Sequence, residues 1–203
     1  MTDAVDTERT ALSRGDARRA AIRNAAVEQF LVRGYAATSM ANIAEAAGVS
    51  RPAVYQYFRD KSDVLASAFV AVFEARATAA LEASKAAPTT EAALDALLQR
   101  YDGDLWELVA GSPHYDELIA AKSPAMATAI YAELDRYWAA VSAWLAELHP
   151  GSGRECVRRR AGWLDLLRWS PQGMRYDRPP VEEFRRRLAA LARSVAADIA
   201  AST

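Results

Sequence analysis

The chain has 203 residues, of which 52% are hydrophobic and 25% charged, with a formal net charge of −1 at pH 7. This composition is ordinary for a globular protein of one or two domains, and a pI near 6.2 gives no global argument for nucleic-acid binding. The single cysteine, Cys156, excludes an internal disulfide. No apolar stretch reaches the ~18 residues of a membrane span, and the polar N-terminus has no signal core, so we expect a cytoplasmic protein without a membrane partner.

Charge is distributed unevenly along the chain. Eight Lys or Arg stand against four Asp or Glu between residues 14 and 62, whereas the rest of the chain is acidic. This is a modest basic bias that fits either DNA binding or a chance clustering on a solvated surface.

The first 33 residues are predicted to form an arm and a helix. Residues 1–15 are polar and unpatterned, and we expect them to be flexible. A helix capped by Ser13 or Asp16 should run to about Arg33 and stop at Gly34. Its apolar positions recur at helical spacing: Ile22, Ala25, Ala26 and Phe30. Three arginines on the opposite face are either solvated or available to phosphates: Arg18, Arg19 and Arg23.

The stretch from residue 38 to residue 61 contains the signals of two short helices separated by a tight turn. Ser39 is predicted to cap the first helix, and Gly48 to end it in a left-handed conformation. Ser50 is predicted to cap the second helix, which has Pro52 in its first turn. These signals predict a helix-turn-helix, whose second helix can enter the major groove of DNA.

The remainder of the chain is predicted to be helical, since alanine is frequent and β-branched runs are scarce. Asp60 should cap a long helix that ends near Lys85, and Thr90 should cap the next. Another helix opens with Pro124 in its first turn. It ends before a loop over residues 149–153.

Two further helices, about 154–170 and 181–200, are predicted to complete the chain. The first carries apolar residues on two faces, and the second has a single apolar stripe with arginines opposite. They are either core helices of a monomer or the faces of a homodimer. The predicted fold class is therefore all-α. A three-helix helix-turn-helix domain over residues 16–62 is expected to precede a helical bundle over residues 63–203.

The stretch from Ala20 to Leu65 resembles the DNA-binding domain of the tetracycline-repressor (TetR) family of bacterial transcriptional regulators. The resemblance rests on these residues: Ile22, Ala25, Ala26, Phe30, Gly34-Tyr35, Thr38-Ser39-Met40, Ile43-Ala44, Ala46 to Ser50, Val54 to Phe58, Lys61 and Leu65. It implies a regulator, usually a repressor, that binds a palindromic double-stranded DNA operator. It also implies a homodimer through the last two helices and release from DNA when a small molecule binds the second domain.

The predicted second helix of the helix-turn-helix divides into an inner and an outer side. Val49, Val54 and Phe58 should pack inward. Arg51 has the fork of donors that suits guanine O6 and N7, while Tyr55 and Tyr57 are either groove contacts or core aromatics. The resemblance places the following residues at the groove: Arg51, Pro52, Ala53, Tyr55 and Tyr57. It places three more at backbone phosphates: Thr38, Ser39 and Lys61.

All five tryptophans lie beyond residue 100, in the predicted second domain. A helical bundle with so many large aromatics can enclose an apolar pocket for a small apolar or aromatic effector. Each candidate taken alone is more often a core residue than a ligand contact. The candidate lining is Trp106, His114, Tyr115, Met126, Trp138 and Trp163.

Enzymatic readings find no support in the sequence. The two histidines, His114 and His149, lack the Glu-x-x-His spacing of a helical metal site, and no Gly-rich phosphate loop is present. We therefore expect no catalytic residues, no metal and no cofactor. The alternative is an enzyme, or a helical ligand-binding or interaction protein, without DNA-binding function. It would leave Arg51, Tyr55 and Lys61 unexplained.

Overall fold

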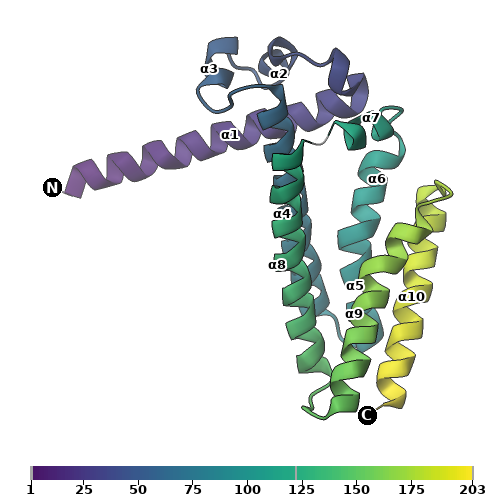
Figure 1. The fold of residues 1–203 in the computed structure, drawn as a ribbon. Helices are drawn as coiled ribbons and strands as arrows, with labels where there is room; N and C mark the ends of the chain where they lie inside the picture. Colours follow the sequence, from purple (N-terminus) through teal and green to yellow (C-terminus); the bar gives the residue numbers. More distant parts are fainter. Residues whose placement is uncertain (1, 122, 203) are drawn as a thin grey trace. The chain divides into compact units, whose positions relative to one another are not determined.

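The computed structural model describes residues 2–121 and 123–202, with side chains described from residue 14 onward except at residue 125. Every regular element in this part of the chain is a helix, which confirms the predicted all-α class (Figure 1). In chain order the elements are α1 (Thr2–Ala37), α2 (Met40–Ala46), α3 (Arg51–Tyr55), α4 (Lys61–Ala86), α5 (Thr90–Leu98), the π-helix η1 (Gln99–Gly103), α6 (Asp104–Ala110), α7 (Tyr115–Ala120), α8 (Pro124–Leu148), α9 (Arg154–Met174) and α10 (Val181–Ala201).

The chain divides into two compact units. The first contains the residues up to Ala71 and the segment Ser112–Ala127, and the second contains Val72–Gly111 and the residues from Thr128 on. The predicted boundary after residue 62 therefore lies further along α4, and the segment around α7 belongs to the first unit. Two hydrogen bonds explain its place: Ser112 Oγ donates to Leu31 O at 2.7 Å, and Ala36 N donates to Glu117 Oε1 at 2.6 Å.

Helix α1 begins at Thr2, so residues 2–15, predicted as an arm outside the helix, are part of it. The first residue of that predicted arm lies outside the described residues. Neither Ser13 nor Asp16 is an N-cap, because the helix passes through both; no proline precedes them to stop it. Gly34 interrupts the helix, as predicted, with φ 80° and ψ 168°. The predicted apolar face is buried: Ile22, Ala25, Ala26 and Phe30.

The second unit is a helical bundle in which α10 packs on α5, η1 and α9. Helices α9 and α10 run side by side and are joined by a short loop (Figure 1). Leucines on one side of α5 meet the apolar stripe of α10 in one continuous core. Its largest fully buried members are Leu94, Leu97, Leu98, Leu145, Leu167 and Phe184.

Two predicted element ends in this unit differ from the structure. Thr89, not Thr90, caps α5, because Ala92 N donates to Thr89 Oγ1 at 3.2 Å. Helix α9, predicted to end at residue 170, continues through Pro171 to Met174. Pro171 is buried in the bundle, and this packing holds the last turn although a proline removes one helical hydrogen bond.

Helix α4 is the one helix among the described residues with the length and apolar composition to cross a membrane, at a mean hydropathy of 1.6. Its uninterrupted apolar run ends at Glu74, and a core helix of a globular protein passes the same test. Its buried apolar side chains belong to the two cores: Val64, Leu65 and Ala68 in the first unit, and Ala77 and Ala80 in the second. We therefore read α4 as a helix that both units share.

Candidate nucleic-acid interface

Helix α2 is fixed at its start by a capping box. The Ser39 hydroxyl accepts a hydrogen bond from Asn42 N at 3.2 Å, and Ser39 N donates to Asn42 Oδ1 at 3.0 Å. Two amides of the first turn are thereby satisfied without any other element. Ile43 and Ala44 point into the core, where their exposed fractions are 0% and 3%. The predicted cap is confirmed.

The turn between α2 and α3 has the geometry that the sequence predicted. Gly48 lies at φ 63°, in the left-handed region, and Val49 N donates back to Ala44 O at 3.0 Å. Ser50 then caps α3, because Ala53 N donates to its hydroxyl at 3.3 Å. The two helices and their turn form a helix-turn-helix, in which α3 is the second helix.

Helix α3 separates inner from outer side chains as expected. Val54 and Phe58 are 0% and 1% exposed, whereas Tyr55 keeps 46% of its surface exposed. Arg51 lies one turn before Tyr55, with its guanidinium carbon 5.7 Å from the ring centroid and Nη2 3.5 Å from the phenol oxygen. Of the other predicted groove residues, Pro52 is exposed, and Ala53 and Tyr57 are half-buried.

The outward pair of Arg51 and Tyr55 is the part of this surface best suited to contact bases. Arg51 presents several N–H donors in a fixed fork, which matches the acceptors on the major-groove edge of guanine. Tyr55 adds a phenol hydroxyl and a flat apolar ring beside it. Because Val54 anchors the inner side of the same short helix, the position of the pair is set by the core of the unit.

Thr38, predicted at a phosphate, is instead an internal cap. Its side chain is 1% exposed, and its hydroxyl donates to Gly34 O at 2.6 Å and to Gln29 O at 3.2 Å. A buried hydroxyl that already donates to the end of α1 does not face DNA. Ser39 beside it is exposed and remains a predicted phosphate contact.

Lys61 is also held more tightly than a free phosphate-binding lysine. Its Nζ donates to Tyr35 O at 2.5 Å and to Ala36 O at 3.3 Å, and lies 4.3 Å from the centroid of the Tyr35 ring. Lys61 therefore joins the first residue of α4 to the end of α1. Its positive charge lies on the same unit as α3, so its contact with DNA stays a prediction. Its two hydrogen bonds also give Lys61 a role in positioning α4 against the end of α1.

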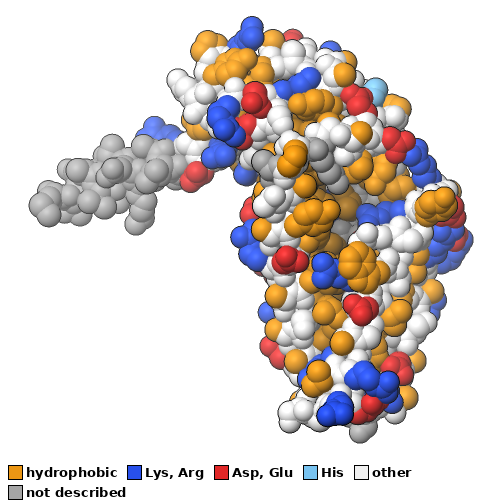
Figure 2. Space-filling view, in the orientation of Figure 1, with side chains coloured by type: hydrophobic (Ala, Val, Ile, Leu, Met, Phe, Trp, Pro, Cys, Tyr) orange, Lys and Arg blue, Asp and Glu red, His pale blue; other side chains and the backbone are white. Residues whose placement is uncertain are grey.

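For Arg19 on α1, the sequence left open whether the side chain is only solvated or contacts a phosphate. Its guanidinium carbon lies 5.2 Å from the centroid of the Phe58 ring, just beyond α3. The side chain is exposed and its neighbour Arg18 is exposed too. Figure 2 shows several Lys and Arg side chains on the surface of the first unit. A cation–π contact that orders Arg19 beside α3 makes it a further candidate for phosphate contact.

The six predicted effector residues do not form one set. The first unit contains His114, Tyr115 and Met126, and the second contains Trp106, Trp138 and Trp163. Trp106 Nε1 donates to Pro179 O at 2.9 Å, and Trp163 Nε1 donates to Asp198 Oδ2 at 2.7 Å. These two tryptophans tie helices together in the core. Trp138 differs, because it belongs to an aromatic group around Tyr101.

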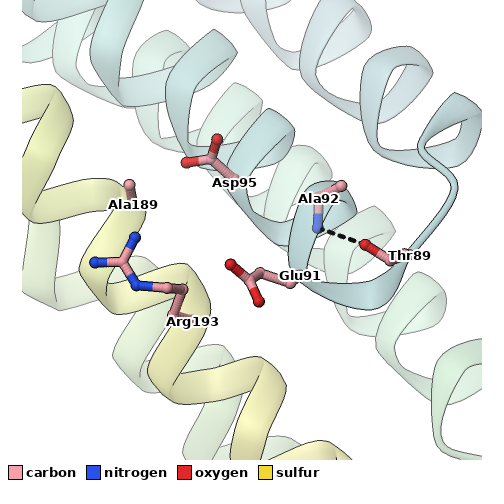
Figure 3. A pocket seen from close by; sticks show the side chains of 6 residues that line it. All are labelled: Thr89, Glu91, Ala92, Asp95, Ala189 and Arg193. Atoms are coloured by element: carbon pink, nitrogen blue, oxygen red, sulfur yellow. Dashed lines mark hydrogen bonds between the residues drawn. The ribbon is translucent and has the colours of Figure 1, made fainter.

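A hollow on the surface of the second unit, of about 290 Å³, lies between α5 and α10 (Figure 3). Its lining is largely polar and includes the side chains of Glu91, Asp95 and Arg193. Charged groups of both signs in an open position do not suit an apolar effector. Within the described part of the chain, no three His, Cys, Asp or Glu side chains come together as a metal-binding group.

Comparisons with known proteins agree with this geometry. Residues 22–68 match the family described as bacterial regulatory proteins, tetR family. The match covers α2, α3 and the segments that pack on them. A comparison with curated proteins found no match.

Solved structures with the same fold extend over nearly the whole chain. A TetR-family transcriptional regulator from Mesorhizobium loti is 22% identical, with a TM-score of 0.64 over 91% of this chain and 97% of that one. A tetR-family regulator from Streptomyces coelicolor is 23% identical, with a TM-score of 0.61 over 93% and 84%. The regulator FadR from Bacillus subtilis, solved in complex with stearoyl-CoA, is 22% identical, with a TM-score of 0.53 over 88% and 96%.

The family match falls on the residues that build the helix-turn-helix, and the fold of the whole chain is the one these regulators share. Residues 22–68 therefore form a DNA-binding domain of the tetR family of bacterial regulatory proteins, in a chain that has the fold of the solved TetR-family regulators.

Proposed function

We propose that the protein is a homodimeric repressor that binds a palindromic operator through two copies of α3 and leaves it when a small molecule binds the second unit. The observation that carries the proposal is the outward pair of Arg51 and Tyr55 on a helix that is capped by Ser50 and anchored by Val54. The operator lies on the chromosome, so the proposal also places the protein in the cytoplasm.

The exposed face of α9 supports the homodimer. Leu166 and Trp169 lie three residues apart on one side of this helix and keep 48% and 53% of their surfaces exposed, which is unusual for large apolar side chains. Figure 2 shows hydrophobic side chains among the charged ones on the visible face of the bundle. On α10 the exposed positions include small residues that allow close approach of a partner helix: Ala190, Ser194 and Ala197. A two-fold dimer would also present two copies of α3, as a palindrome requires.

A related structure supports the proposal that a small molecule binds the helical bundle of the second unit. The FadR regulator, which shares this fold, was solved in complex with stearoyl-CoA, so a regulator of this architecture can bind an organic ligand. In our proposal a ligand of this chain favours one of two conformations of the dimer, and only the other fits the operator. Release then requires that the ligand bind one conformation more tightly.

A binding titration of the Arg51→Ala variant against the DNA upstream of the protein's own gene and against scrambled DNA tests the reading role. Loss of one guanine contact should reduce the preference for the upstream DNA by about 5–150-fold, which corresponds to about 1–3 kcal/mol. Lys61→Ala should weaken binding to both DNAs alike and flatten the salt dependence. Arg154→Ala, at the start of α9, is the control and should change neither.

Equal losses from Arg51→Ala on both DNAs would contradict base reading by Arg51. No binding of the unaltered protein to either DNA would overturn the proposal that it is a repressor.

Light scattering tests the dimer: Trp169→Glu should give a monomer with much weaker operator binding. Tyr131→Glu is the matched control, because Tyr131 on α8 is 65% exposed and lies outside the proposed interface. A dimer that survives Trp169→Glu would exclude this face of α9.

A further inference from the structure

The interior of the second unit contains polar groups that DNA binding does not use. Arg76 on α4 is 8% exposed, and its Nε and Nη1 atoms have no hydrogen-bond partner in the described structure. Tyr101 in η1 is 4% exposed, and its hydroxyl is unpartnered in the same sense. Buried donors almost always have partners, because an unmade hydrogen bond in a protein interior is costly. Two such groups in one interior indicate a binding site.

The charges around Arg76 leave it as the cation without a direct ion pair. Asp102 lies 3.7 Å from Arg175, measured from Oδ1 to Nη2. Asp104 Oδ1 accepts a hydrogen bond from Arg185 Nη2 at 2.9 Å. These carboxylates therefore contact other arginines directly, and among the described residues no ion pair within 4 Å joins either of them to Arg76. Burial lowers the pKa of Arg76 to about 10, opposed by Asp104 and Tyr101, so the guanidinium stays charged at neutral pH.

The π-helix η1 brings Tyr101 to this place. It spans Gln99–Gly103, and its three consecutive residues Tyr101, Asp102 and Gly103 are all buried. Arg185 on α10 fixes the turn: Gln99 Nε2 donates to Arg185 O at 2.9 Å, and Arg185 Nη1 donates to Gln99 Oε1 at 3.1 Å. Single π turns inside α-helices occur frequently at functional sites.

Aromatic rings surround the same position. Tyr101 stacks on Tyr137 with ring centroids 3.9 Å apart and an angle of 14° between the planes. Trp138 meets Tyr101 edge-on at 6.1 Å, and Phe73 lies at 6.5 Å. These rings come from α4, η1 and α8 and form an apolar wall around Tyr101, the ring whose hydroxyl interacts electrostatically with Arg76. A charged end next to an apolar wall fits a ligand with one polar head and an apolar body.

We propose that Arg76 and Tyr101 bind the carboxylate of a small organic acid whose apolar body lies against Phe73, Tyr137 and Trp138. The inference rests on the proposed function, since this acid would be its effector. A guanidinium and a phenol hydroxyl both donate to a carboxylate, and a charge-assisted bond is about twice as strong as a neutral one. The unpartnered Nε and Nη1 donors of Arg76 match a carboxylate, whereas a cationic ligand would meet a like charge and a neutral one would leave Arg76 unpaired.

The test measures binding to the full-length protein without DNA, by calorimetry and by thermal shift. The probes are 3-phenylpropionate, 4-phenylbutyrate, indole-3-acetate, octanoate and dodecanoate, each compared with its primary amide. The amide keeps the shape and removes the charge. We expect at least one acid to bind about tenfold or more tightly than its amide. A panel in which no acid exceeds its amide overturns the proposal.

Variants then assign the preference to named atoms. Arg76→Met should remove the difference between acid and amide, Arg76→Lys should keep part of it, and Tyr101→Phe should reduce it. Arg193→Met, which removes the same charge from the surface hollow between α5 and α10, should leave the ratio unchanged. If Arg76→Met does not fold, as circular dichroism would show, Arg76→Lys and Tyr101→Phe decide. An unchanged ratio in the folded variants overturns the site.

Operator DNA in the same cell separates this inference from the proposed function. Acid binding that depends on Arg76 but leaves the operator complex intact supports the site and contradicts release by this effector. Operator binding that is lost only to neutral compounds supports the repressor and overturns the carboxylate site.

Discussion

The two units of this protein place their polar groups in opposite ways. In the first unit, Arg51 and Tyr55 point outward from a short helix whose inner side is buried. In the second, Arg76 and Tyr101 point inward, among aromatic rings and ion pairs. An outward pair can read a rigid, highly charged polymer, whereas an inward pair can select a small molecule that fits between helices. Under the proposed functions, the outward pair serves DNA binding and the inward pair serves ligand selection.

Loss of one core phenylalanine in each unit should have the largest effect and tests whether the units are independent. Phe58 and Phe184 are 1% and 0% exposed, and replacing a buried Phe by Ala costs about 3–5 kcal/mol. Phe58→Ala should abolish DNA binding and lower amide-exchange protection in α2 and α3. Phe184→Ala should lower protection in α5 and α10. Equal loss of protection in both units, from either variant, would show that they unfold as one.

The buried acid of the second unit should make its stability depend on pH. Burial raises the pKa of Asp102 from 3.8 to about 6, opposed by Arg175 and Arg76. Between these values the folded chain binds more protons than the unfolded chain, so the free energy of unfolding falls as pH rises through this window. The shift corresponds to about 3 kcal/mol at pH 7.

Denaturant unfolding of the unaltered protein and of Asp102→Asn at pH 4, 5, 6 and 7 measures this effect. Relative to Asp102→Asn, the unaltered protein should gain stability on acidification from pH 7 to pH 4, approaching about 3 kcal/mol. Other carboxylates contribute to both curves equally and cancel in the difference. Parallel curves would mean that Asp102 is solvated and would remove one support for a closed interior around Arg76.

The sequence was sufficient for most of the first unit because its determinants are local. Ser39 and Ser50 cap helices through amides three residues away, and Gly48 turns the chain by its own conformation. The partners of Thr38 and Lys61 were missed because they are carbonyl groups at the end of α1, and the DNA contact of Lys61 stays a prediction. For Lys61 that partner is 26 residues away, and no periodicity reveals such a bond.

The site in the second unit could not be predicted for the same physical reason. Arg76 on a long helix looks like one charge of a solvated face, and only packing shows that it is buried. The π-helix at Tyr101 depends on Arg185, which lies 86 residues from Gln99. Tryptophan content correctly indicated a bundle rich in aromatics. It did not distinguish Trp106 and Trp163, which donate hydrogen bonds across the core, from Trp138 beside Tyr101.

A smaller effect is expected at Gly34, where the first unit depends on a conformation that only glycine adopts easily. With φ 80° and ψ 168°, Gly34 lies in a region that costs other residues about 1–3 kcal/mol. A Cβ there would lie 2.2 Å from Glu117 Oε2 and 2.7 Å from His114 Nδ1. Gly34→Ala should therefore displace Glu117 from Ala36 N and disturb the carbonyl groups that Lys61 binds.

Thermal unfolding and an operator titration of Gly34→Ala measure both consequences. We expect lower stability of the first unit and weaker binding to operator and scrambled DNA alike, since the position of α3 changes but its side chains do not. Gly15→Ala is the matched control: no atom lies within 4 Å of its Cβ position, and alanine within a helix is favoured over glycine by about 0.5–1 kcal/mol. If Gly34→Ala leaves DNA binding unchanged while Glu117 is displaced, the contact of α7 with α1 supports the fold of the first unit but does not position Arg51 and Tyr55.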